Sequence, residues 1–122
     1  MANPSTVPAS AAGTEILRRA YIEGMTGTND YVLLNGAANY TYTILSVIFC
    51  ENAGVTTDSF NMSVEYDGGS SKVFLIKGQP IGSNATFVWN DKIILSETDE
   101  LIVSNATNAI DVYCTYIEQR WA

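Results

Sequence analysis

The fold is decided by residues 80–121, which read PIGSNATFVWNDKIILSETDELIVSNATNAIDVYCTYIEQRW. Short apolar runs at 86–89, 92–95, 100–103 and 110–117 alternate with polar clusters at 90–91, 97–99 and 104–108. Strands of antiparallel β-sandwiches are short and closely spaced in this way, with Asn, Asp, Ser and Gly in the turns between them. The stretch therefore predicts four consecutive strands, and no catalytic signature lies inside it.

The same pattern continues upstream. Residues 30–34, 39–51, 59–66 and 72–77 are predicted strands, and the pair Asn35-Gly36 is a strong reversal signal. Residues 78–80 are expected to break the last of these strands, because they contain glycine and proline. Residues 14–23 fit the periods of a helix and of a strand about equally well, and we favour a strand because the surrounding chain is all β. The prediction is an all-β, jelly-roll-like antiparallel sandwich of about eight strands, formed by a single domain at 14–122.

The longest predicted strand, 39–51, differs from the others because both of its faces become apolar from Ile44 onward. A strand with one wet face would alternate apolar and polar residues. We therefore expect it to be central, with its outer face covered by another element or another subunit. Strict alternation gives one face Tyr40, Tyr42, Ile44, Ser46, Ile48 and Cys50, and the other face Thr41, Thr43, Leu45, Val47 and Phe49.

Residues 1–13 form a predicted extended arm, because the segment has two prolines, mostly small side chains and no charged side chain. Such a segment cannot bury enough apolar surface to order itself. We expect the arm to lie against adjacent subunits, with Trp121 as a further anchor onto a neighbour. The candidate assembly residues are Asn3, Pro4, Val7, Pro8, Phe49, Arg120 and Trp121.

Length and charge limit the classes of function. The 122 residues correspond to one domain, only 16% of them are charged, and the formal net charge is −7. An average soluble domain carries roughly 25% charged residues, so the low value suits a surface that contacts other protein chains. The six basic residues are scattered, which argues against nucleic-acid binding. No apolar run reaches the roughly 18 residues of a membrane helix, so no membrane partner is predicted.

Catalytic and metal chemistry find little support. The chain has no histidine, which excludes serine–histidine and cysteine–histidine catalysis. The acidic cluster of Glu97, Asp99 and Glu100, with Asp91 upstream, allows a calcium site or an ordinary solvated turn. We favour the turn, because the spacing matches no EF-hand loop. We therefore predict a non-enzymatic protein without catalytic residues, metal or cofactor.

The aromatic residues and the cysteines each leave two interpretations open. Aromatic side chains could stack on sugars or could pack in the core and at interfaces, and we favour packing for Tyr42 and Tyr116. Cys50 and Cys114 could form a disulfide or act as buried thiols. Residues 1–13 lack the basic start and apolar segment of a signal peptide, so we favour reduced thiols in a reducing cytoplasm. The aromatic candidates are Tyr40, Tyr42, Tyr113, Tyr116, Trp89 and Trp121.

Several of these stretches together resemble the small β-sandwich virion proteins of tailed bacteriophages, which decorate or cement the head or sit at the neck and tail. The resemblance covers roughly residues 16–119 and is clearest in KIILSETDELIV at 92–103, followed by AIDV at 109–112. The usual version has glycine and aspartate in the turn before Leu101, where this chain has Thr98-Asp99. The other contributing stretches are DYVLL at 30–34, TILSVIF at 43–49, FNMSV at 60–64 and PIGSNATF at 80–87.

The resemblance implies a structural, multimeric protein, often a homotrimer when it cements a capsid. The leading hypothesis is a head decoration protein that self-associates and binds the major capsid protein, located in virions assembled in the host cytoplasm. The alternatives are a neck or tail component and a carbohydrate-binding module for host recognition.

Overall fold

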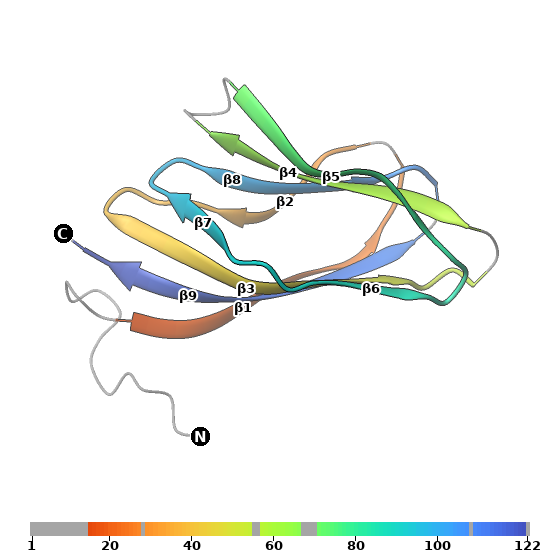
Figure 1. Cartoon of the computed structure of the whole chain (residues 1–122), viewed down its shortest axis with the longest axis horizontal. Helices are drawn as coiled ribbons and strands as arrows, with labels where there is room; N and C mark the ends of the chain where they lie inside the picture. Colours follow the sequence, from red (N-terminus) through yellow and green to blue (C-terminus); the bar gives the residue numbers. More distant parts are fainter. Residues whose placement is uncertain (1–14, 28, 55–56, 67–70, 108, 122) are drawn as a thin grey trace.

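The chain folds into two layers of antiparallel strands (Figure 1), which confirms the predicted all-β sandwich. The computed structural model describes residues 15–27, 29–54, 57–66, 71–107 and 109–121, so the predicted arm at 1–13 lies outside the described residues. The described residues 15–23 of the ambiguous segment form a strand, as favoured. The strands are β1 (Glu15–Met25), β2 (Tyr31–Asn35), β3 (Tyr40–Glu51), β4 (Asp58–Tyr66), β5 (Ser71–Ile81), β6 (Thr86–Trp89), β7 (Ile93–Ser96), β8 (Glu100–Asn105) and β9 (Ile110–Arg120).

The two layers are a five-stranded and a four-stranded sheet. The first, here called sheet A, has the order β1-β9-β3, and both β6 and β7 pair with the remaining edge of β3. The second, sheet B, has the order β2-β8-β4-β5. Strand β3 is therefore central, as predicted. No helix that could cross a membrane occurs in the described ranges.

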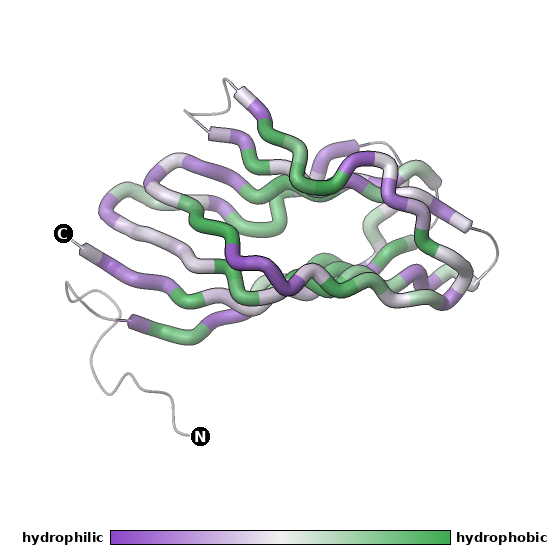
Figure 2. The backbone as a smooth tube through the Cα atoms, in the orientation of Figure 1, coloured by the Kyte–Doolittle hydropathy of each residue, from purple (hydrophilic) through white to green (hydrophobic). Residues whose placement is uncertain are grey.

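The core lies between the two sheets and is built around aromatic rings. Figure 2 shows apolar segments along the strands of both layers. The rings of Phe49 from β3 and Phe60 from β4 stack with their centroids 4.2 Å apart, and Phe87 from β6 packs edge-on against Phe60 at 5.3 Å. At the other end, Tyr42 and Tyr116 are buried and meet edge-to-face at 5.5 Å. These two tyrosines therefore pack in the core, which is one of the two locations, core or interface, that the sequence favours for them.

A β-bulge in β3 changes which side chains face the core. The register with β9 shifts between Ile44 and Ser46. Before the shift, Tyr42 and Ile44 are buried; after it, Val47 and Phe49 are buried. The strict alternation expected for 39–51 is therefore wrong beyond Leu45, because one extra residue in a bulge moves all following side chains to the opposite face.

Strand β5 is longer than the predicted 72–77, because the expected break at 78–80 is accommodated inside it. Gly78 has a φ of +63°, which glycine adopts without strain, and its N–H donates to Asn61 Oδ1 at 2.8 Å. The register with β4 shifts on either side of Met62. Pro80 is tolerated because β5 is an edge strand, where one side of the backbone needs no hydrogen-bonded partner.

The two cysteines do not form a disulfide with each other. Cys114 of β9 pairs with Val47 and faces the core, whereas Cys50 of β3 pairs with Asp111 and faces outward. Burial raises the pKa of the Cys114 thiol from 9.0 to about 11, and a backbone hydrogen bond to Ala20 opposes this. Cys114 thus acts as a small hydrophobic side chain.

We expect Phe60→Ala to lower the free energy of unfolding by about 3–5 kcal/mol, because it removes the partner of Phe49 and leaves a cavity between the sheets. Phe74→Ala is the matched control, since Phe74 is half exposed on β5, and it should cost about 1 kcal/mol or less. Urea unfolding followed by tryptophan fluorescence measures both. Equal losses for the two variants would contradict the placement of Phe60 at the centre of the core.

Stability should fall as the pH rises from 9 to about 11. In this window the unfolded chain loses the Cys114 proton while the folded chain keeps it, so the unfolding free energy drops by roughly 2–3 kcal/mol. Burial also raises the pKa of Tyr42 and Tyr116, which adds a loss above pH 10. In Cys114→Ala the loss between pH 9 and 10 should disappear. An unchanged pH profile in this variant would mean that Cys114 is not protected in the folded state.

Candidate assembly surface

Most of the residues predicted to mediate assembly do not lie on the described surface of the protein. Asn3, Pro4, Val7 and Pro8 lie outside the described residues. Phe49 is 0% exposed and stacks on Phe60, so assigning its side chain to an assembly surface is corrected: the bulge in β3 turns it into the core.

Arg120 and Trp121 lie at the end of β9. Trp121 is exposed, and its backbone N–H donates to the carbonyl of Asn39 at 3.0 Å. Gln119 pairs with Glu15, the first residue of β1, so the chain enters β1 beside the end of β9 (Figure 1). The entry point of the predicted arm and the exposed Trp121 thus share one end of sheet A.

The outward-facing side of sheet A, here called the outer face, exposes several large apolar side chains. Ten large hydrophobic side chains are exposed in the described part of the chain, and five of them lie on this face. Single exposed hydrophobic residues are ordinary, but a contiguous patch indicates an interaction site. The five are Leu17, Tyr21, Val88, Ile94 and Tyr113.

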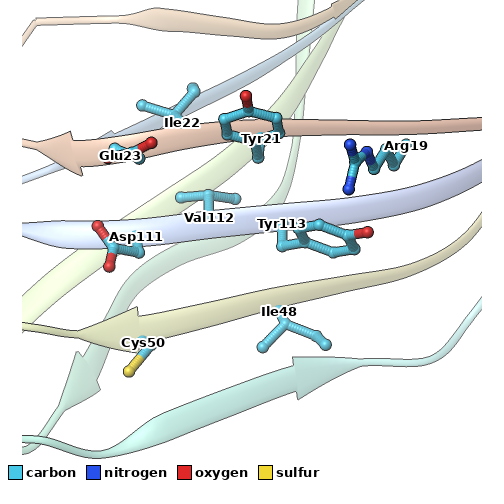
Figure 3. A pocket seen from close by; sticks show the side chains of 9 residues that line it. All are labelled: Arg19, Tyr21, Ile22, Glu23, Ile48, Cys50, Asp111, Val112 and Tyr113. Atoms are coloured by element: carbon cyan, nitrogen blue, oxygen red, sulfur yellow. The ribbon is translucent and has the colours of Figure 1, made fainter.

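One row of apolar side chains crosses four strands of the outer face. Tyr21 of β1 pairs with Tyr113 of β9, Tyr113 pairs with Ile48 of β3, and Ile48 pairs with Val88 of β6. Figure 3 shows Tyr21, Tyr113 and Ile48 on three neighbouring strands. We call this the tyrosine row. Tyr21 is 57% exposed, so most of its ring is available to a partner.

A second apolar row, here called the leucine row, lies farther along the same strands. It runs from Leu17 of β1 through Ile117 and Thr43 to Ile94 of β7. Ile94 is 55% exposed. Since residues of one face recur at every second position, the two rows are separated by one polar row.

That central polar row carries a lone basic side chain. Arg19 of β1 pairs with Thr115 of β9, which pairs with Ser46 of β3. Arg19 is exposed and forms no ion pair among the residues that the structure describes. A positive charge therefore lies between two apolar rows.

Acidic residues border the face at both ends. Glu15 precedes the leucine row and accepts a hydrogen bond from Gln119 Nε2 at 3.4 Å. Asp111, with Glu23 close by, follows the tyrosine row (Figure 3). The Asp111 carboxylate accepts hydrogen bonds from the Gly24 N–H at 2.7 Å and from Asn52 Nδ2 at 3.1 Å, so it is held in place. The outer face is thus ordered acidic, apolar, basic, apolar, acidic along the strands.

A shallow hollow of about 350 Å³ lies at the tyrosine row. Tyr21, Tyr113 and Ile48 form its apolar part, and Arg19 and Asp111 bring opposite charges to it (Figure 3). Its shape suits a flat or shallow contact and differs from the deep, enclosed pockets in which small molecules bind.

Two buried carboxylates elsewhere serve the loops of the sandwich. Glu51 Oε1 accepts the N–H groups of Gly54 and Asn84, at 2.9 and 3.1 Å. Asp58 accepts Asn105 Nδ2 at 2.9 Å and both the N–H and the hydroxyl of Thr107. Both groups face backbone donors and amides, an arrangement that fixes loops.

The acidic turn at 97–100 is also used structurally. Asp99 Oδ2 accepts the N–H of Ser96 at 3.0 Å, and the Asp99 carbonyl accepts the N–H of Gly36 at 2.8 Å. Among the described residues, no group of three or more His, Cys, Asp or Glu side chains is placed to hold a metal ion.

Sequence reasoning missed most of the outer face. Tyr113 is among the aromatic candidates, but Leu17, Arg19 and Tyr21 lie in the segment whose sequence fits both a helix and a strand. Their alternation with Ile16, Ala20 and Ile22 was the signal, once a strand is assumed. Trp89, another of the aromatic candidates, is only partly exposed and packs against the core.

Comparisons with known proteins give the fold alone. No protein-family model matches the chain, and no curated protein sequence is significantly similar to it. A chain from the Bacillus endospore appendages, described as disulfide-linked pili, is 12% identical with a TM-score of 0.54 and covers 96% of this chain and 97% of its own. The Drosophila NLP core, described in terms of pentamer formation and histone binding, is 9% identical with a TM-score of 0.55 and covers 89% of this chain and 100% of its own.

A viral protein shares the fold as well. A chain from the structure of infectious bursal disease virus strain Gx is 8% identical with a TM-score of 0.53. The match covers 98% of this chain and only 37% of the viral chain, so this sandwich corresponds to one part of a larger viral protein. The same fold is therefore found in a viral structure and in a pilus protein.

Proposed function

We propose that this chain is a non-enzymatic structural protein of a bacteriophage virion, and specifically a decoration protein that cements the head. The observation that carries the proposal is the outer face of sheet A, where two exposed apolar rows lie on either side of one polar row. A surface of this composition favours burial against another protein chain. The resemblance to small virion proteins and the fold shared with a viral chain support the same assignment.

The proposal that the protein is not an enzyme rests on its side-chain chemistry. The sequence has no histidine, which is the commonest general base. The buried carboxylates Glu51 and Asp58 hold loop N–H groups and amides. The hollow at the tyrosine row is shallow and mostly lined by apolar side chains. These features suit a subunit whose function is to bind other protein chains.

In the proposed assembly, copies of the chain associate with one another, most simply as a trimer, and bind the major capsid protein. Strand β1 begins at Glu15, which pairs with Gln119 near the exposed Trp121 at one end of sheet A. The predicted arm at 1–13 would reach a neighbouring subunit and order on binding. We therefore assign to the arm and to Trp121 contacts that add avidity to the contact made by the domain.

The proposal predicts the copy number of the chain in purified particles. Quantitative mass spectrometry should give a ratio to the major capsid protein near one, because a cement protein covers the whole lattice. Deleting residues 1–12 should leave the urea unfolding midpoint nearly unchanged and should weaken decoration of bare heads by at least about tenfold. A ratio of a few per hundred would instead favour a neck or tail position, and undiminished decoration by the truncated chain would refute the role of the arm.

One observation favours a second candidate, a carbohydrate-binding module. Tyr21 and Tyr113 are exposed cross-strand neighbours beside Arg19 and Asp111, and aromatic rings next to polar groups can stack on sugars. The decoration hypothesis predicts that the isolated chain binds no bacterial polysaccharide on a glycan array. Binding that is lost in Tyr113→Ser and kept in Tyr66→Ser, an exposed tyrosine of sheet B, would favour the carbohydrate-binding module instead.

A further inference from the structure

We infer that the outer face of sheet A packs against the same face of a second copy, with a two-fold axis parallel to the strands. The inference rests on the proposed function, since it specifies one of the self-contacts of a structural subunit. It follows from the order of the rows and from the positions of the charges on this face.

A face-to-face pair can be built around two axes that lie in the plane of the contact. If the axis runs across the strands, each β1 lies over the partner's β1. Arg19 in the central row then faces the partner's Arg19, and Glu15 at one end faces the acidic end that carries Glu23 and Asp111. Like charges opposed in this way are costly, so the charges disfavour this arrangement.

If the axis runs along the strands, each row of one copy lies over the same row of the partner, with the order of the strands reversed. Leu17 then lies over Ile94 and Tyr21 over Val88, so apolar side chains cover apolar side chains. At the acidic ends, Glu15 faces Ser96 of β7 rather than another carboxylate. Two sheets packed with nearly aligned strands are a common arrangement in β proteins.

The charges at the two ends of the central polar row also favour an axis along the strands. Trp89 of β6 pairs with Val47 and Ile93 of β7 pairs with Ile44, so the connection at 90–92 runs along the edge of sheet A beside the central row. This connection carries Asp91, which is exposed. Arg19 lies at the opposite end of the same row. With the axis along the strands, each Arg19 faces the partner's Asp91, and the contact contains two such pairs.

The size of the face is sufficient for a weak, specific contact. Four neighbouring strands spaced about 4.8 Å apart, over eight residue steps of about 3.3 Å, give a footprint of roughly 500 Å² per copy. The pair therefore buries about 1,000 Å² in total, which is at the lower limit of specific interfaces. A contact of this size suits a lattice, where many copies act together. It closes at two copies, so a trimer would have to be built by other elements.

The test is a charge-swap cycle on the full chain, with dissociation constants from sedimentation equilibrium at low salt. Arg19→Asp and Asp91→Lys should each weaken self-association about tenfold, because each places like charges together. The double variant Arg19→Asp/Asp91→Lys should recover to within about threefold of the natural chain. Lys77→Asp changes an exposed basic residue on β5 of sheet B and is the matched control, with no effect expected.

The apolar rows are tested with Ile94→Lys, which should weaken self-association by at least about tenfold. Val73→Lys on β5 is its control, since Val73 is similarly exposed but lies on sheet B. A chain that stays monomeric, or one that self-associates without coupling between positions 19 and 91, would overturn the inference.

Particle incorporation separates this inference from the proposed function. A monomeric chain that still decorates heads at a ratio near one would overturn the two-fold contact and leave the decoration role intact. If the charge-swap variants behave as expected but the chain is missing from purified particles, the two-fold contact is supported and the virion role is overturned.

Discussion

The β-bulge in β3 is the constraint on which both faces of sheet A depend. On one side of the bulge Tyr42 and Ile44 enter the core, and on the other side Val47 and Phe49 enter it. Without the shift Phe49 would face outward, and its stack on Phe60, which joins the two sheets, could not form. The same shift turns Ile48 outward, where it links Tyr113 to Val88 and completes the tyrosine row. Core and candidate assembly surface are thus set by one local feature.

The outer face is notable for its order more than for its apolar content. Isolated hydrophobic side chains are common on protein surfaces. On sheet A the register aligns such residues into two rows, with Arg19 between them and carboxylates beyond them. Because charges of opposite sign occupy defined positions, the face can discriminate between orientations of a partner, which apolar area alone cannot do.

The sequence was sufficient to predict the fold class and the strands at 86–89, 100–103 and 110–117, because short runs bounded by turn residues leave few alternatives. It could not place the bulge, since apolar residues on both sides of Leu45 hide a change of face. It also could not show that Tyr21 lies beside Tyr113, because cross-strand pairing between distant segments is set by the whole sheet. The β1 segment was ambiguous for a related reason: its strand conformation is stabilised by β9, and its own residues are also good helix formers.

Net charge and local charge act in opposite directions in any assembly of this chain. Each copy carries a formal charge of −7, so copies repel one another at long range, and salt screens this repulsion. Arg19 is an isolated positive charge on the outer face, whereas Glu15, Glu23 and Asp111 lie at the two ends of that face. Close approach through the outer face therefore brings apolar rows together, with Arg19 at one end of the row between them, and keeps Glu15, Glu23 and Asp111 at the margin, where they remain hydrated. This distribution reconciles an acidic chain with self-contact: the long-range repulsion limits unspecific association, and the sheet face provides the orientation in which it is overcome.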